Sequence, residues 1–124
     1  MMTAFDLNAE KPELRDRYGR HQYGQSALLA RRLVEAGSSC VTINTGYWDH
    51  HNGIEKGLEE HLPPLDRAIG TPIADLDERG KLDDFLIYCA GDVRRTPLLT
   101  GHPVPHPLLH RFSLQLCLAG FADL

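Results

Sequence analysis

The segment at residues 46–52 holds the side chains best suited to metal chemistry, in the order Gly-Tyr-Trp-Asp-His-His-Asn. Asp49 and His51 are two residues apart, so an extended backbone would place them on the same side of the chain. A carboxylate and an imidazole directed to one point can share a divalent cation, with bonds of about 2.0–2.2 Å to a zinc-type ion. The competing interpretation is a pair of solvated or capping residues. We expect Trp48 to be a packing anchor and His50 to be exposed.

A second chemically interesting segment spans residues 91–97, in the order Gly-Asp-Val-Arg-Arg-Thr-Pro. Asp92 directly follows an apolar run, so it would lie at the end of a buried strand. The guanidinium of Arg94 or Arg95 forms a planar fork that matches the oxygens of phosphate or sulfate. The competing interpretation is a solvated basic turn.

Histidine is unusually frequent, with seven residues, five of which fall in or beside predicted loops. Because histidine is the commonest metal ligand, this clustering favours a metal site. His106 lies in a proline-stiffened stretch at residues 101–107, which could equally be a disordered loop. His21 and His61 fall in helical segments, where we expect surface positions.

Hydrophobic spacing predicts the elements that must position these residues. In the second predicted helix, Leu29, Leu33 and Ala36 recur at helical spacing, which predicts that they form its buried face. Gly37 and Gly80 are predicted helix ends, and Pro63-Pro64 is expected to divide the helical pattern that starts at Ile54. The predicted helices cover residues 12–18, 23–36 and 54–80, and the predicted strands cover 39–44, 85–90 and 112–119, with a long proline-rich loop over 91–110.

The order helix, strand, helix, strand, loop, strand predicts an α/β fold with a mostly parallel sheet and crossover helices. Ligands of such sheets bind beyond the carboxyl ends of the strands. The loops after Asn44 and after Ala90 both start at such ends. We therefore expect two loops that are distant in the sequence to meet at one crevice.

Composition limits the class of protein. The 124 residues suffice for one domain, and a net charge of −4 gives no electrostatic case for a nucleic-acid partner. No apolar run approaches the roughly 20 residues of a membrane-spanning helix, and the first residues lack the pattern of a signal peptide. Cys40, Cys89 and Cys117 lie in apolar runs, so we expect buried free thiols.

Taken together, several segments resemble one known family. Trp48-Asp49-His50-His51 is similar to its Trp-Asp-Thr-His motif, and residues 91–97 are similar to its Gly-Glu-Phe-Gly-Arg-Thr-Pro motif. Residues 14–21, 24–26, 28–37, 62–68 and 75–80 resemble its helical segments, in the right order. The chain thus resembles the bacterial "domain of unknown function 1501" group, which is abundant in planctomycetes and is sulfatase-like within the alkaline-phosphatase superfamily. The resemblance covers about residues 5–97, and residues 98–124 diverge.

The resemblance implies a three-layer alkaline-phosphatase-like α/β fold that hydrolyses phosphate or sulfate esters, small or polysaccharide, at divalent metals such as zinc, calcium or magnesium. Asp49 and His51 would match one metal-ligand pair, Asp92 a further acidic ligand, and Arg95 the anion-binding arginine. The family continues with an Arg-Asp-His-Trp motif, for which His106 is the nearest candidate, without the aspartate. Full-length members are often exported, whereas this chain gives no localisation signal of its own.

Departures from the family pattern define the alternatives. Asp92 stands where the family has glutamate, and Arg94 where it has glycine. Superfamily nucleophiles come from a much earlier strand, so we expect residues 1–124 to form a single incomplete domain that is inactive alone, with no catalytic residue to name. The alternatives are a degenerate structural fragment and a metal- or anion-binding module without catalysis. In each case, we expect open sheet edges to favour self-association or marginal stability.

Overall fold

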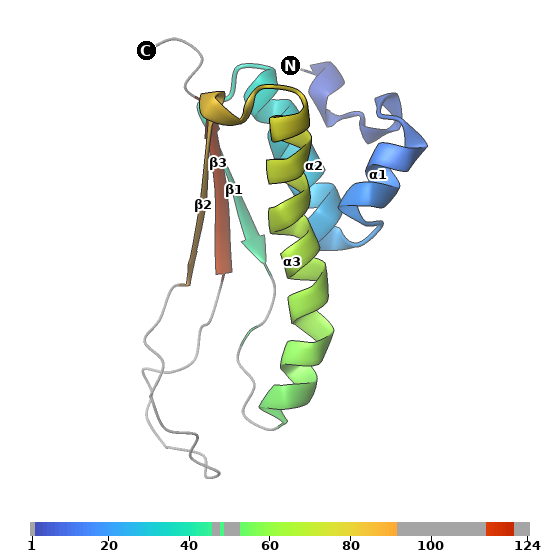
Figure 1. Ribbon diagram of the computed structural model, residues 1–124, viewed down its shortest axis with the longest axis vertical. Coiled ribbons are helices and arrows are strands. Elements are labelled where there is room, and N and C mark those ends of the chain that lie inside the picture. Colours follow the sequence, from blue (N-terminus) through green and yellow to red (C-terminus); the bar gives the residue numbers. More distant parts are fainter. Residues whose placement is uncertain (1, 46–47, 49–52, 92–113, 121–124) are drawn as a thin grey trace.

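The computed structural model describes residues 2–45, 48, 53–91 and 114–120, and this part folds into two layers, with the helices on one face of a sheet (Figure 1). The helices are α1 (Pro12–Tyr18), α2 (Gln22–Glu35) and α3 (Ile54–Glu78), and the strands are β1 (Cys40–Thr45), β2 (Phe85–Gly91) and β3 (Leu114–Gly120). Short 3-10 helices cover η1 (Met2–Phe5), η2 (Leu7–Ala9) and η3 (Leu82–Asp84). All six predicted helices and strands are therefore present, each within two residues of its predicted bounds.

The helix ends follow the local signals. Pro12 occupies the first turn of α1, where its missing N–H removes no intrahelical hydrogen bond. Gly37 and Gly80 follow α2 and α3 with φ angles of 99° and 63°. Residues with a Cβ avoid this left-handed region, so glycine ends the helix at low energetic cost.

Helix α3 is continuous from Ile54 to Glu78, so the predicted division at Pro63-Pro64 is wrong (Figure 1). Each proline removes one hydrogen bond to the carbonyl four residues earlier, here those of Glu59 and Glu60. Both of these residues are exposed to solvent. Water can therefore replace the missing donors, and the helix passes through the prolines.

The sheet order is β1-β3-β2, and β3 is antiparallel to both neighbours, so the prediction of a mostly parallel sheet is wrong. Strands β1 and β2 do run in the same direction and are joined through α3, as a crossover unit requires. However, β3 lies between them. Parallel pairing needs a crossover connection, usually a helix, whereas β3 enters the sheet beside the residue at which β2 ends. That return makes β3 antiparallel.

The carboxyl ends of β1 and β2 nevertheless lie at the same end of the sheet. Thr45, the last residue of β1, pairs with Leu114, and Gly91, the last residue of β2, pairs with the same Leu114 from the other side. The amino-terminal half of α3 extends beyond this end of the sheet (Figure 1). The chain therefore leaves β1 and β2 at two points that are separated by one strand.

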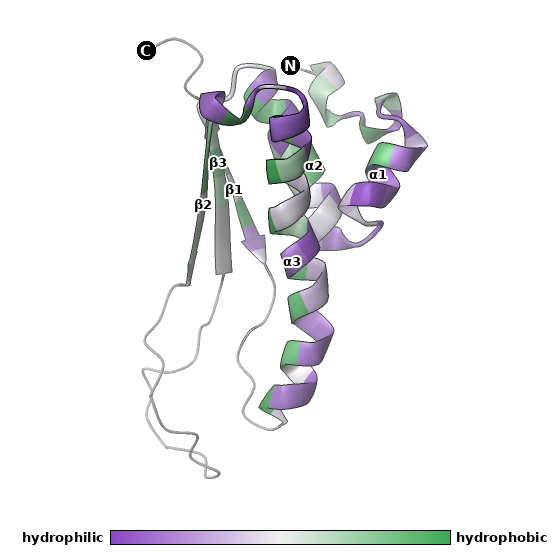
Figure 2. Ribbon diagram, viewed as in Figure 1, coloured by the Kyte–Doolittle hydropathy of each residue, from purple (hydrophilic) through white to green (hydrophobic). Residues whose placement is uncertain are grey.

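The core lies between α2, α3 and the sheet. Figure 2 shows hydrophobic residues along β1 and β2, and mostly hydrophilic residues on α1 and the first turns of α3. The core cluster comprises Tyr18, Ala27, Leu28, Ala30, Val34, Ile43, Ala68 and Leu118. The predicted buried face of α2 is wrong: Leu29 and Leu33 are only half-buried and Ala36 is exposed. The small residues of the adjacent face, among them Gly24 and Ala27, are buried instead.

The opposite face of the sheet has no covering layer among the described residues (Figure 1). Leu86 and Tyr88 are 50% and 58% exposed. Cys40 and Cys89 are exposed and Cys117 is half-buried, so the expectation of buried thiols is wrong. Cys40 and Cys117 lie on this uncovered face, whereas Cys89 points to the opposite face of β2. Within the described residues, no helix is long and apolar enough to span a bilayer.

Candidate functional site

Trp48 is fixed in place at the carboxyl end of β1. Its indole N–H donates a hydrogen bond of 3.0 Å to the carbonyl oxygen of Thr45, and its side chain is buried. The indole ring lies 5.4 Å from the imidazole of His61, centroid to centroid, at an interplanar angle of 44°. Both contacts hold the residue that directly precedes Asp49. Trp48 is therefore a packing anchor, as expected.

Two further rings continue from Trp48 toward α2. The Tyr23 hydroxyl lies 3.3 Å from Nδ1 of His61, and the Tyr23 ring makes an edge contact with His21 at 6.3 Å. His61 lies on the half of α3 that extends beyond the sheet. His21 and His61 are both partly buried and engaged, so the expectation of simple surface positions is wrong. We call His21, Tyr23, Trp48 and His61 the aromatic row.

His21 also begins α2. Its Nδ1 accepts a 3.1 Å hydrogen bond from the backbone N–H of Gly24, which satisfies one of the free donors of the first helical turn. Burial lowers the pKa of His21, and the nearby positive charge of Arg67 lowers it further. A lowered pKa favours the neutral ring, and only the neutral ring can accept at Nδ1. Histidine thus serves as the N-cap here.

The predicted ligands Asp49, His51, Asp92 and His106 and the predicted anion-binding Arg95 all lie outside the described residues. The structure places their points of attachment. Asp49 follows Trp48 directly, and Asp92 follows Gly91, the residue that pairs with Leu114 opposite Thr45. Within the described part of the chain, no group of three or more histidine, cysteine or acidic residues is arranged to hold a metal ion.

A family model described as "Protein of unknown function (DUF1501)" matches residues 1–103. The chain belongs to the DUF1501 family. The match includes the segments of Asp49, Asp92 and Arg95, and it ends before His106. No curated protein and no solved structure matches this DUF1501 chain.

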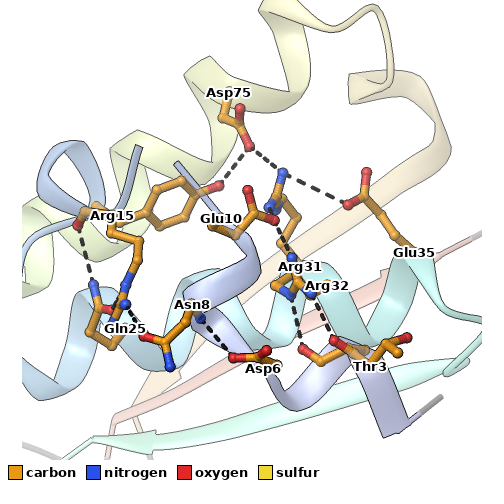
Figure 3. A network of polar contacts seen from close by, with 12 residues as sticks. Thr3, Asp6, Asn8, Glu10, Arg15, Gln25, Arg31, Arg32, Glu35 and Asp75 are labelled. Carbon is orange, nitrogen blue, oxygen red and sulfur yellow. Dashed lines mark hydrogen bonds and ion pairs between the residues drawn. The ribbon is translucent and has the colours of Figure 1, made fainter. Parts of the chain in front are cut away.

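A buried charged network in the DUF1501 chain was not expected from the sequence (Figure 3). Asp75 on α3 accepts hydrogen bonds from the Tyr18 hydroxyl at 2.9 Å and from Nη1 of Arg31 at 3.1 Å. Arg31 and Asp75 are 3% and 4% exposed. Glu10 in turn accepts from Arg31 Nη2 and from Arg32 Nη1, at 2.5 Å each. The network therefore ties the N-terminal segment and α1 to α2 and α3.

Arg31 lies off the predicted stripe of Leu29, Leu33 and Ala36, yet its side chain is almost fully buried. A signal was available, since Arg31 follows Ala27 and Leu28 by four and three residues and so shares their face. Its Nε is buried and, among the described residues, has no hydrogen-bond partner. An arginine in this position pairs with acidic residues from two directions, which indicates a structural role.

The pKa values of Glu35 and Tyr18, two groups of this network, reflect their charged neighbours. Partial burial alone would raise the pKa of Glu35, but the hydrogen bond from Arg79 and the charge of Arg31 outweigh burial and hold the pKa below its ordinary value. Burial and the neighbouring Asp75 raise the pKa of Tyr18, because an ionised phenol beside a buried carboxylate would be strongly disfavoured. The pairing thus favours a neutral Tyr18 and an ionised Glu35.

Proposed function

We propose that this DUF1501 chain supplies a metal- and anion-binding half-site for the hydrolysis of phosphate or sulfate esters, built from Asp49, His51 and Asp92 with Arg95. One observation carries the proposal. The segments bearing Asp49 and Asp92 leave the sheet at Thr45 and Gly91, on either side of Leu114. Neighbouring strands lie roughly 4.8 Å apart, so these two points are about two strand spacings, or about 10 Å, from each other. Side chains from both segments can reach one ion across that distance.

The donor chemistry fits a divalent cation. Two carboxylates and an imidazole match the nitrogen and oxygen ligands of zinc-type sites, and a carboxylate-rich set also accepts calcium or magnesium. His106 is a further candidate ligand. When bound, such a metal polarises an ester oxygen and stabilises the charge that develops on it. The fork of Arg95 would bind the remaining anionic oxygens.

The aromatic row supports the proposal through positioning. Trp48 is held by the Thr45 carbonyl and by His61, so the backbone immediately before Asp49 starts from a fixed point. Metal ligands gain affinity when surrounding residues fix their orientation. Trp48 would therefore act as a positioning residue for Asp49.

Calorimetric titration with zinc tests the proposal. We expect Asp49→Ala and His51→Ala to lower zinc affinity at least tenfold, since each removes one direct ligand. Asp77→Ala is the matched control, because Asp77 is an exposed aspartate on α3, remote from the strand ends in the sequence. Equal zinc affinity in the wild type and both ligand variants would eliminate the site.

Turnover separates the half-site from a complete enzyme. We expect the chain to bind zinc and to hydrolyse 4-nitrophenyl phosphate or sulfate weakly or not at all, because no nucleophile is among the residues we assign. Robust zinc-dependent hydrolysis by the purified chain, lost in Asp49→Ala, would show that the site is complete.

A further inference from the structure

Two of the three cysteines meet on the uncovered face of the sheet. Cys40 is the first residue of β1, and Cys117 lies in the middle of β3. Cys117 pairs directly with Thr42, so Cys40 is its diagonal neighbour on the same face. Their Sγ atoms lie 2.7 Å apart, against about 2.05 Å for a covalent disulfide bond. The two free thiols thus need only a small approach to bond.

Cys89 provides an internal comparison, because it lies on a neighbouring strand but on the other side of the sheet. Tyr88 is the β2 residue opposite Cys117, and Cys89 is opposite Leu116. Successive residues of a strand point to opposite faces. Cys89 therefore points away from the face that carries Cys40 and Cys117, although it is also exposed.

The thiols of Cys40 and Cys117 are accessible to reagents in solution. Cys40 is exposed and Cys117 is half-buried, so a small reagent reaches Cys40 first. Thr42 lies beside the pair, with its Oγ1 3.5 Å from the Cys117 sulfur. A bond between residues 40 and 117 would link two neighbouring strands of the sheet that are the first and the last in chain order.

We propose that Cys40 and Cys117 are a modification site that forms a reversible disulfide between β1 and β3, with a low-molecular-weight disulfide as the oxidant. The thiolate of Cys40 attacks one sulfur of the oxidant, which forms a mixed disulfide and releases one thiolate. The thiolate of Cys117 then attacks the Cys40 sulfur, forms the Cys40–Cys117 bond and releases the second thiolate. The protein loses two protons and two electrons, and the oxidant becomes two thiols.

Mass spectrometry of the reduced chain after exposure to oxidised glutathione tests this proposal. Trypsin leaves each cysteine in a different peptide, at residues 33–56, 82–94 and 112–124. We expect the native protein to lose two hydrogen masses and to yield a linked peptide of 33–56 with 112–124. Dithiothreitol should reverse both changes. The oxidised chain should melt roughly 5–15 °C higher than the reduced chain, since the cross-link restricts the unfolded state.

Variants sharpen the result. Cys89→Ser should retain the cross-link, whereas Cys40→Ser and Cys117→Ser should stop at a glutathione adduct. The wild-type peptide map does not depend on how well any variant folds. The proposal is overturned if native wild type accumulates only glutathione adducts, if the linked peptide contains residues 82–94, or if the same mixture of links forms in native buffer and in denaturant.

Discussion

The indole N–H of Trp48 donates to the carbonyl oxygen of Thr45, the last residue of β1. This single bond connects the end of a strand to the residue directly before Asp49. Together with the ring of His61 on α3, it makes Trp48 part of the folded core. Residues that bind metal benefit from such support, because less conformational entropy is lost on binding.

Substitution of Trp48 therefore has two separable effects. Trp48→Phe retains a large ring but removes the hydrogen bond, and we expect a stability loss of about 1 kcal/mol with a measurable loss of zinc affinity. Trp48→Ala also leaves a cavity and should cost about 3–5 kcal/mol. Urea unfolding and zinc titration on the same samples measure the two effects. Unchanged zinc affinity in folded Trp48→Phe would show that the anchor has no influence on the ligands.

Substitution by alanine is expected to have opposite effects on stability at Gly24 and at Gly70. A Cβ on Gly24 would lie 2.0 Å from the Tyr18 carbonyl oxygen, whereas a Cβ on Gly70 would meet nothing within 4 Å. We expect Gly24→Ala to destabilise the chain by about 1–3 kcal/mol. Gly70→Ala, in the interior of α3, should stabilise it by about 0.5–1 kcal/mol. Chemical denaturation measures both, and changes of the same sign would contradict the packing of α1 against α2.

Asp75 is the acceptor on which the buried network depends. Asp75→Ala leaves Nη1 of Arg31 and the Tyr18 hydroxyl buried without the carboxylate that both contact, while Glu10 still pairs with Nη2, so we expect a loss of about 3–5 kcal/mol. Asp77→Ala, two residues along α3 and exposed, should change stability by less than about 0.5 kcal/mol. Tyr18→Phe should lie between the two. Thermal unfolding of the three variants ranks them, and a loss below about 1 kcal/mol in Asp75→Ala would mean that Glu10 alone suffices to pair the buried Arg31.

The cap of α2 predicts a pH dependence. The folded-state pKa of His21 is lowered from its ordinary value of 6.5, so the unfolded chain takes up the proton first. The stability from the neutral ring is therefore present above about pH 6.5 and is lost as the pH falls below that value. His21→Asn keeps a capping oxygen without a titratable ring, and His21→Ala removes the cap at a cost of about 1 kcal/mol.

Unfolding at pH 7.5 and pH 5 measures this effect. The gap in stability between the wild type and His21→Asn should shift against the wild type at the lower pH. His21→Ala should be the least stable of the three at pH 7.5. A gap that does not change with pH would mean that His21 does not cap α2 as a neutral ring.

Local patterns predicted the helices and strands well, because their signals lie within short stretches. Pro12, Gly37 and Gly80 mark helix ends through backbone geometry alone. The continuity of α3 was missed because the packing of its buried residues, among them Leu65, Ala68 and Leu76, is a property of the folded chain. The burial of Arg31 was missed for a related reason, since its acidic partners come from distant segments.

The predicted sheet topology was wrong at the connection between β2 and β3. The sequence order suggested a parallel sheet, yet no helix was predicted between the second and third strands, and parallel pairing needs a crossover. The absence of a predicted helix between these two strands already favours an antiparallel β3. The expected meeting of the two loops depends only on β1 and β2 running the same way, and that relation holds with β3 between them. The ligands themselves stay a prediction.

The central claim is that Asp49 and Asp92 bind one metal ion. A double-mutant cycle of zinc affinity, with Asp49→Ala, Asp92→Ala and both together, tests it most directly. Two ligands of one ion should each lower affinity at least tenfold, and the double variant should lose clearly less than the product of the two single losses. Independent, multiplicative effects, or no effect from either substitution, would contradict a shared site between the ends of β1 and β2.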